Sequence, residues 1–238
     1  DITTNDIRYY LAMDQEQRKI SMSYMDTIRR YLSSFFAWIS DEGYISRNPM
    51  RRLKKIKVPR MIKKPFTQAE MEHLRCNAES QRDIAIMAFL YSTAARIGEA
   101  VRLDREDIDW GNKEVIIYGE KGKKERRVYL TDDCAYHLQK YLATREDNNP
   151  ALFVSNKQPH TRLGKQAIQS MLRTLGNKTE IHAHPHKFRR TLLTDAGNRG
   201  IPLQEIQMYA GHQKPDTTMM YVTVSEENVK ASFRRYIS

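Results

Sequence analysis

The pattern of apolar and polar positions predicts a short helical module at the start of the chain. Residues 21–40, SMSYMDTIRRYLSSFFAWIS, place apolar side chains at helical spacing, with Arg29 and Arg30 off the stripe that they form. The stripe consists of Met25, Ile28, Leu32, Phe35, Phe36 and Ile39. The opening stretch TTNDIRYYLAM indicates an earlier helix, capped by Thr4 or Asn5. So small a module buries little surface, and the chain begins with Asp rather than Met, so we expect the natural protein to extend further at its N-terminus.

Beyond residue 66 the pattern indicates a larger, mainly helical domain. TQAE at 67–70 has the spacing of a capping box, which marks the start of a helix. Helices are expected at 67–77, 81–93, 96–103, 132–144, 164–175, 186–198, 202–209, 215–222 and 226–237. Strands are predicted at 114–118 and 126–130, joined as a hairpin through GEKGKKE, with a third at 151–155. The expected fold class is therefore mainly α with a small antiparallel β-sheet.

Positive charge is concentrated between these two regions. The 40 Lys and Arg against 29 Asp and Glu give a net charge of +11, and residues 1–64 hold 14 of the basic and 7 of the acidic residues. Residues 48–65, NPMRRLKKIKVPRMIKKP, contain no acidic residue. Their basic side chains are Arg51, Arg52, Lys54, Lys55, Lys57, Arg60, Lys63 and Lys64. This segment is either a solvated tether or a strap against a phosphate backbone, and we favour the strap.

Composition excludes several classes of protein. The overall charge favours a polyanionic partner, either nucleic acid or an anionic membrane. No run of about 18 apolar residues could span a membrane, and the first residues lack the pattern of a signal peptide. We therefore expect a soluble intracellular protein. Cys76 and Cys134 are the only cysteines, and because they lie 58 positions apart they predict neither a metal site nor a disulfide framework.

Candidate chemistry is spread over four stretches of the second region. In STAARIGEAVRL, Arg96 precedes Glu99 by three positions, a spacing that on its own indicates only a weak surface ion pair. Lys121 in GEKGKKERR, taken alone, is a solvated turn lysine. In HPHKFRRTLLTDAG, His186 and Arg189 share a helical face, with His184 and Arg190 as nearby competitors. The fourth stretch is AGHQKPDTTMMY, in which Tyr221 follows His212 by nine residues.

These stretches, in this order, resemble the tyrosine recombinase, or phage integrase, family. The resemblance rests on TAARIGEAVRL, YGEKGKKERRVYL, HPHKFRRTLLTDAG and AGHQKPDTTMMY, and ISRNPMRRLKKIKVP is similar to the family's boundary between core-binding and catalytic domains. It implies a helical, SAM-like core-binding domain at 1–50, a basic linker at 51–65 and an α+β catalytic domain at 66–238, with a tail helix at 226–238. This sequence departs from the family at Ala94, Ala95, Arg190 and Ala210, where glycine, leucine, histidine and leucine are usual.

The resemblance also implies the roles of the site residues. Tyr221 would be the nucleophile that attacks a DNA phosphate and forms a covalent phosphotyrosine. Arg96, Arg189 and His212 would hold that phosphate, because guanidinium forks bind its oxygens and stabilise growing negative charge. His186 would act as base and Lys121 as acid, while Glu99 orients its neighbours. The arginines take the role that a metal has elsewhere, so neither a metal nor another cofactor is expected.

The tail and the cellular role follow from the same resemblance. In SEENVKASFRRYIS, a stripe of Val229, Phe233, Tyr236 and Ile237 either packs on its own domain or docks into a neighbouring protomer, as in the family. We therefore expect a site-specific recombinase acting on double-stranded DNA as a tetramer, in the cytoplasm of a prokaryote on its nucleoid, and serving a mobile element. The alternatives are a type IB topoisomerase-like enzyme and a catalytically silent DNA-binding regulator.

Overall fold

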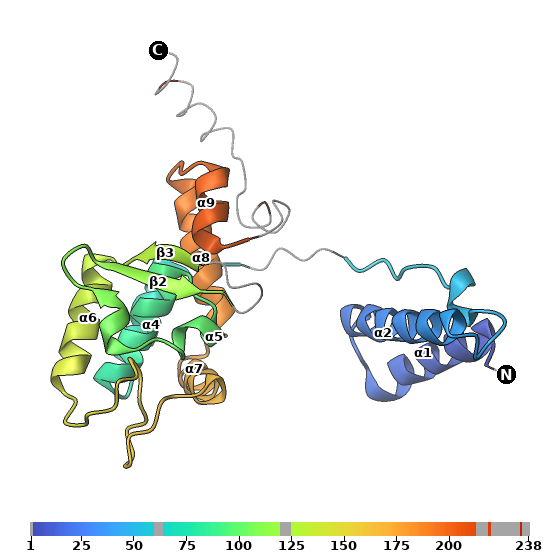
Figure 1. Cartoon of the computed structure of the whole chain (residues 1–238), viewed down its shortest axis with the longest axis horizontal. Coiled ribbons are helices and arrows are strands. Elements are labelled where there is room, and N and C mark those ends of the chain that lie inside the picture. The colour runs from blue at the N-terminus through green and yellow to red at the C-terminus, as the bar shows by residue number, and fades with distance from the viewer. Residues whose placement is uncertain (1, 60–63, 120–124, 213–218, 220–233, 235–238) are drawn as a thin grey trace. The chain divides into compact units, whose positions relative to one another are not determined.

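The computed structural model describes residues 2–59, 64–119 and 125–212, together with residues 219 and 234. The chain divides into two compact units, Asp1–Ile62 and Lys63–Ser238, which are described separately (Figure 1). The domain boundaries expected at residues 50 and 66 stay predictions. The helices expected at 215–222 and 226–237 fall almost entirely outside the described residues.

The first unit consists of two helices and a short 3₁₀ turn. These are α1 (Thr4–Arg18), α2 (Met22–Asp41) and η1 (Pro49–Arg52). Thr3 caps α1 in a capping box with Asp6, so the predicted cap at Thr4 or Asn5 was wrong by one or two positions. Thr3 is the cap because Asp6 stands three residues after it: the Asp6 carboxylate accepts the backbone N–H of Thr3, and the Thr3 hydroxyl accepts the backbone N–H of Asp6.

The apolar stripe of α2 forms most of this unit's core. Met25 and Phe36 are buried together with Ile7 and Leu11 of α1 and Met50 of η1. Phe35 was predicted to belong to the stripe, but its side chain is 51% exposed. A stripe covered by one partner helix and one 3₁₀ turn is narrow, so Phe35 at its edge packs beside Phe36 and Trp38 rather than under them.

The second unit is built from seven α-helices and a small sheet among its described residues. The helices are α3 (Gln68–Cys76), α4 (Gln81–Thr93), α5 (Ile97–Ala100), α6 (Asp132–Ala143), α7 (Lys165–Thr179), α8 (Pro185–Asn198) and α9 (Leu203–Ala210), and η2 (Arg105–Asp107) is a 3₁₀ turn. Most bounds lie close to the predicted ones. The capping box of Thr67 with Glu70 is confirmed. Two bounds differ more, since α5 ends at Ala100 rather than 103 and α7 continues to Thr179 rather than 175.

The sheet has three antiparallel strands in the order β1-β2-β3. They are β1 (Ile108–Asp109), β2 (Glu114–Tyr118) and β3 (Glu125–Tyr129), and the predicted hairpin is confirmed by the pairing of Val115 with Val128. The strand expected at 151–155 is absent from the described sheet. Residues 151–154 are buried as an apolar run should be, but they make only isolated bridges, one to Asp104 and one to Arg162.

The core of the second unit surrounds α4. Phe89 and Leu90 of this helix are fully buried, and α6 and α8 pack against it beside the sheet (Figure 1). Cys134 is a buried free thiol within this core, and Cys76 is an exposed one. Among the described residues, no helix combines the length and apolar character that a membrane crossing requires.

Candidate active site

Arg96 stands at the start of α5, directly after the turn that ends α4. Ala94 closes α4 in the left-handed conformation, at φ 48°, and two residues later Arg96 is the N-cap of α5. The guanidinium of Arg96 donates from Nη1 to Glu99 Oε1 at 3.0 Å and from Nη2 to the Gly211 carbonyl at 3.2 Å. The i, i+3 ion pair expected from the sequence is therefore present, and it belongs to a larger arrangement.

Glu99 is a buried carboxylate that joins two arginines. Its side chain is inaccessible to solvent, and besides Arg96 it accepts from Arg126, at 3.1 Å from Nη1 and 2.7 Å from Nη2. It also accepts the backbone N–H of Arg96 at 2.8 Å. Burial alone would raise the pKa of Glu99, but these charged donors outweigh burial and lower it, so the carboxylate is ionised.

Arg126 is the member of the cluster that sequence reasoning missed. It lies on β3 with a side chain only 10% exposed, and its Nε donates to the carbonyl of Tyr209 at 3.0 Å. It belongs to the stretch GEKGKKERR, but its neighbour Arg127 is also an arginine. Alternation along the strand distinguishes the two, since Ile117, the partner of Arg126 in β2, faces the core.

Arg189 on α8 is buried, with 3% of its surface exposed. Its Nη1 donates to the Ala94 carbonyl at 2.5 Å, and its Nη2 donates to the Ala210 carbonyl. The same Nη2 lies 2.8 Å from Nε2 of His212. A guanidinium can only donate, so Nε2 of His212 is the acceptor and the proton of the neutral ring is on Nδ1.

His212 follows the left-handed C-cap of α9, Gly211, at φ 63°. Partial burial lowers the pKa of His212 to about 4, and the charges of Arg189, Arg96 and Arg126 act in the same direction. The imidazole is thus neutral at pH 7 and presents an N–H donor from Nδ1.

The C-terminal end of α9 brings the arginines together. Helix ends leave carbonyl groups without partners inside the helix, and here three successive carbonyls accept from arginines: Tyr209 from Arg126, Ala210 from Arg189 and Gly211 from Arg96. With one carboxylate, Glu99, among three guanidinium groups and a neutral His212, the site carries an excess of positive charge. Such a site favours an anion with several oxygens.

The other predicted site residues are placed as follows. His186 is exposed on the first turn of α8. With Ile97 of α5 it lines an open cavity of about 820 Å³, so it lies beside the helix that Arg96 begins. Lys121 and Tyr221 lie outside the described residues, as do Arg60 and Lys63 of the strap. The strap's described basic residues are exposed: Arg51, Arg52, Lys54, Lys55, Lys57 and Lys64.

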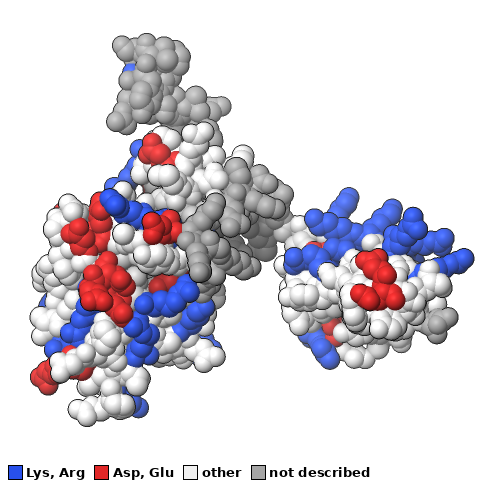
Figure 2. Space-filling model, in the orientation of Figure 1, with Lys and Arg blue, Asp and Glu red and all other residues white. Residues whose placement is uncertain are grey.

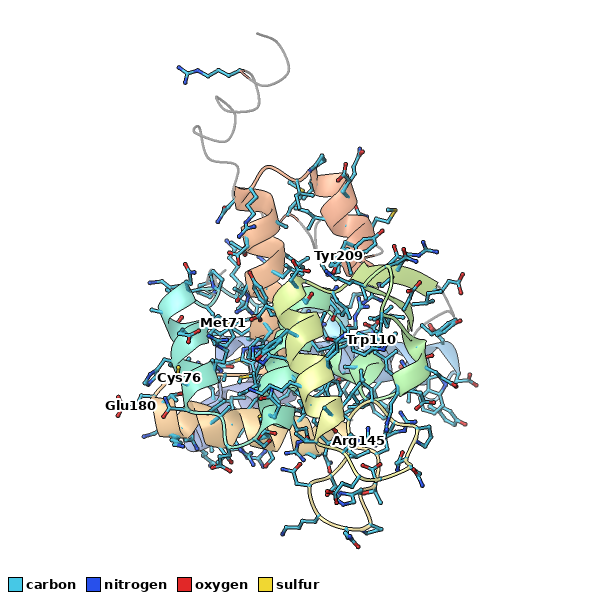
Figure 3. All side chains as sticks on the ribbon, turned by 90° about the vertical axis from the view of Figure 1, so that its left-hand side faces the viewer. Met71, Cys76, Trp110, Arg145, Glu180 and Tyr209 are labelled. Carbon is cyan, nitrogen blue, oxygen red and sulfur yellow. The ribbon has the colours of Figure 1, made fainter. Side chains whose placement is uncertain are left out.

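Tyr209 is the described tyrosine nearest in sequence to the predicted nucleophile. It lies where α9 meets the sheet (Figure 3), stacked on Tyr129 with ring centroids 6.1 Å apart. Its hydroxyl donates to the Ser92 carbonyl at 2.8 Å, and burial raises its pKa to about 12. A hydroxyl committed in this way is a packing group rather than a nucleophile.

Metal ligation is not indicated among the described residues, where no group of three or more His, Cys, Asp or Glu side chains is arranged to hold an ion. Glu99, the carboxylate within the cluster, is fully engaged by arginines.

Comparison with known proteins gives consistent matches. A family model described as "Phage integrase family" matches residues 51–228. The chain is 27% identical over 216 residues to the tyrosine recombinase XerA of Pyrococcus horikoshii, and the aligned region covers 90% of this chain and 74% of XerA. It is also 27% identical over 248 residues to the tyrosine recombinase XerC of Oceanobacillus iheyensis, covering 99% of this chain and 81% of that one.

Solved structures show the same fold. A crystal structure of XerA recombinase matches with a TM-score of 0.63 and 26% identity, over 100% of this chain and 84% of that one. The Tn1549 transposon integrase in complex with a circular intermediate DNA matches with a TM-score of 0.80 and 18% identity, over 99% and 86%.

Proposed function

The chain belongs to the phage integrase family of tyrosine recombinases, site-specific enzymes that cleave and rejoin DNA, and we propose that it does so with Tyr221 as nucleophile. Its substrate is double-stranded DNA carrying specific recombination sites. The observation that carries this proposal is the meeting of Arg96, Arg189 and His212 at the end of α9. They come from separate segments of the sequence and form one cationic site, whose charge and hydrogen-bond donors suit a phosphate.

The proposed reaction is an exchange of phosphate esters. The phenolic oxygen of Tyr221 attacks the phosphorus, the bond to the 5′ oxygen breaks, and a 3′-phosphotyrosine forms. His186 accepts the phenol proton, and Lys121 gives a proton to the departing oxygen. Arg96 and Arg189 stabilise the charge on the remaining phosphate oxygens. Since the phosphodiester becomes another phosphodiester, rejoining needs no nucleotide.

His212 supports the phosphate in a defined state. Its neutral ring offers Nδ1–H as a donor while Nε2 accepts from Arg189. The residue thus donates one hydrogen bond without adding charge. Glu99 does not reach the phosphate in this scheme, since its oxygens are occupied by Arg96 and Arg126.

DNA affinity is assigned to the strap and to the first unit. Exposed basic side chains gather along one side of that unit in Figure 2, and the strap adds a run without acidic residues. Phosphate contacts of this kind give affinity without sequence preference.

Covalent trapping tests the proposal. Tyr221→Phe is expected to bind site DNA normally and to form no adduct on a nicked suicide duplex resolved by denaturing electrophoresis. Tyr209→Phe is the matched control and should still form the adduct, because that hydroxyl is held by Ser92 and Tyr129. An adduct with Tyr221→Phe, or none with the unmodified protein, would contradict the assignment.

Sequencing the DNA that the purified protein retains identifies the recombination site and shows which biological task the protein serves. We propose integration and excision of a mobile element on the nucleoid of a prokaryotic cell, which the match to the phage integrase model supports. Recovery of element ends agrees with this task, whereas recovery of one chromosomal site would assign the protein to chromosome dimer resolution.

We further propose that the tail couples protomers into a tetramer on paired sites. The support is the apolar stripe within 229–237, whose burial would remove several side chains from water at about 1.5–3 kcal/mol each before association costs. Deleting residues 225–238 should abolish higher-order complexes in light scattering and leave single-site binding intact. Identical assembly of the truncated and full chains would place the tail on its own domain.

A further inference from the structure

Arg126 is the arginine of the cluster to which the proposed reaction gives no role. Its side chain is 10% exposed. All three of its guanidinium nitrogens make hydrogen bonds within the protein, two to Glu99 and one to the Tyr209 carbonyl.

We propose that Arg126 is a positioning residue for DNA cleavage. It orients Arg96 through the carboxylate that they share, Glu99, and it holds the end of α9 from which His212 follows. The inference rests on the proposed function, because it assigns a purpose to the arrangement of that same site.

Arg126 acts on Arg96 through the carboxylate of Glu99, which both arginines contact. Glu99 presents both oxygens to Arg126, at 2.7 and 3.1 Å, while Arg96 donates one side-chain hydrogen bond to Glu99 at 3.0 Å. Without Arg126, the buried carboxylate would have Arg96 as its sole described guanidinium partner. The guanidinium of Arg96 would then be drawn toward Glu99 and away from the Gly211 carbonyl that fixes its other end.

Arg126 also holds the turn that follows α9. Gly211 packs directly on Arg126: a Cβ placed there would lie 3.1 Å from Cδ and 3.2 Å from Nη1 of Arg126. The bond from Nε to the Tyr209 carbonyl holds the last turn of α9 as well. Arg126 therefore sets the direction in which the chain leaves α9, and His212 is the next residue.

Arg126 also links this site to strand β3. Arg126 is the second residue of β3, which follows directly after the segment 120–124 that contains Lys121. A single side chain thus ties the strand next to the proposed acid to the elements that hold the phosphate. Misplacement of about 1 Å at such a site costs on the order of 100-fold in rate.

Arg127→Met is the matched control for Arg126→Met. Arg127 is the same residue type on the same strand, but its side chain is 58% exposed and pairs with Glu114 at 3.1 Å. Both variants remove one positive charge, so any difference between them reflects position rather than net charge.

Cleavage and binding are measured separately on a suicide duplex carrying the recovered site. For Arg126→Met we expect single-turnover adduct formation to slow by on the order of 100-fold, with DNA affinity within about threefold of the unmodified protein. Arg126→Lys keeps the charge without the fork and should recover part of the rate, while Arg127→Met should change neither quantity more than about twofold. Equal rates for the two methionine variants would overturn the proposal. So would an equal loss of rate and affinity in Arg126→Met with no recovery in Arg126→Lys, since that would show a structural role alone.

Two further measurements test the positioning role if Arg126→Met does not fold or if no DNA is cleaved. If Arg126→Met fails to fold, Glu99→Gln/Arg126→Met leaves no buried charge unpaired and should fold yet cleave as slowly as predicted for Arg126→Met; a normal rate overturns the proposal. If the unmodified protein forms no adduct on any DNA, the proposed function fails, and inorganic phosphate titrated against the imidazole signals of His212 decides the role of Arg126. There, phosphate should bind Arg126→Met about tenfold more weakly than Arg127→Met, a loss of the size expected for one displaced charged contact, and equal binding refutes the positioning role.

Discussion

Replacing Gly211 by alanine should damage the site more than the fold. Gly211 adopts φ +63°, where a side chain costs about 1–2 kcal/mol. Gly200, in the turn between α8 and α9, has φ +83° and nothing within 4 Å of an added Cβ. Gly200→Ala therefore carries the backbone cost alone and serves as the matched control.

The added methyl at Gly211 meets Arg126 as well. The nearest atoms lie at 3.1, 3.2 and 3.3 Å, so the guanidinium must shift by a few tenths of an ångström. It is held by bonds to Glu99 and to the Tyr209 carbonyl, and weakening one bond to a charged group costs roughly 1.5–3 kcal/mol. We expect Gly211→Ala to be destabilised by about 2.5–5 kcal/mol in total, and Gly200→Ala by about 1–2 kcal/mol.

Thermal unfolding followed by circular dichroism measures the difference. For a unit of this size each kcal/mol lowers Tm by about 2–4 °C, so the control should lose about 2–8 °C and Gly211→Ala clearly more. Adduct formation, assayed well below both midpoints, should be slow only in Gly211→Ala. Equal destabilisation of the two variants together with normal cleavage by Gly211→Ala would show that Arg126 yields freely, and the reasoning would be wrong.

The remaining predictions concern the strap and His212. Neutralising the four basic residues between 51 and 55 should weaken specific and non-specific DNA binding alike and flatten the salt dependence of log K by up to about 3–4 units; an unchanged slope would mean that these side chains only solvate the tether. Since the folded-state pKa of His212 is lowered to about 4, the unfolded chain binds more protons between about pH 6.5 and 4, so the contribution of His212 to stability is present above pH 6.5 and is lost as pH falls toward 4. In urea titrations, His212→Gln should remove that part of the pH dependence, and an unaltered profile would contradict the assignment.

Local chemistry made much of the fold predictable from sequence. The capping box of Thr67 with Glu70 and the hairpin at 114–130 rest on groups three residues apart or on adjacent strands, and both were placed correctly. Arg96 and Glu99 were predicted as a pair for the same reason.

The missed features depend on contacts far apart in the chain. The apolar run 151–154 predicted burial, which the structure shows, but apolarity does not determine whether a buried segment finds a strand to pair with. Arg126 makes its bonds across 27 and 83 positions, to Glu99 and Tyr209. Nothing in its own stretch distinguishes it from a solvated arginine, apart from its place in the alternation of β3.

Because three arginines donate to successive carbonyls at the end of α9, the arginine cluster and the last turn of that helix should form and open together. This helix has eight residues, and only Ile206 and Ala210 are buried, so much of what holds its last turn is the guanidinium groups themselves. If the last turn frays, Arg96, Arg126 and Arg189 each lose an acceptor in the same opening. Amide hydrogen exchange near Gly211 would then report the fraction of molecules in which the three arginines are held together, without any DNA present.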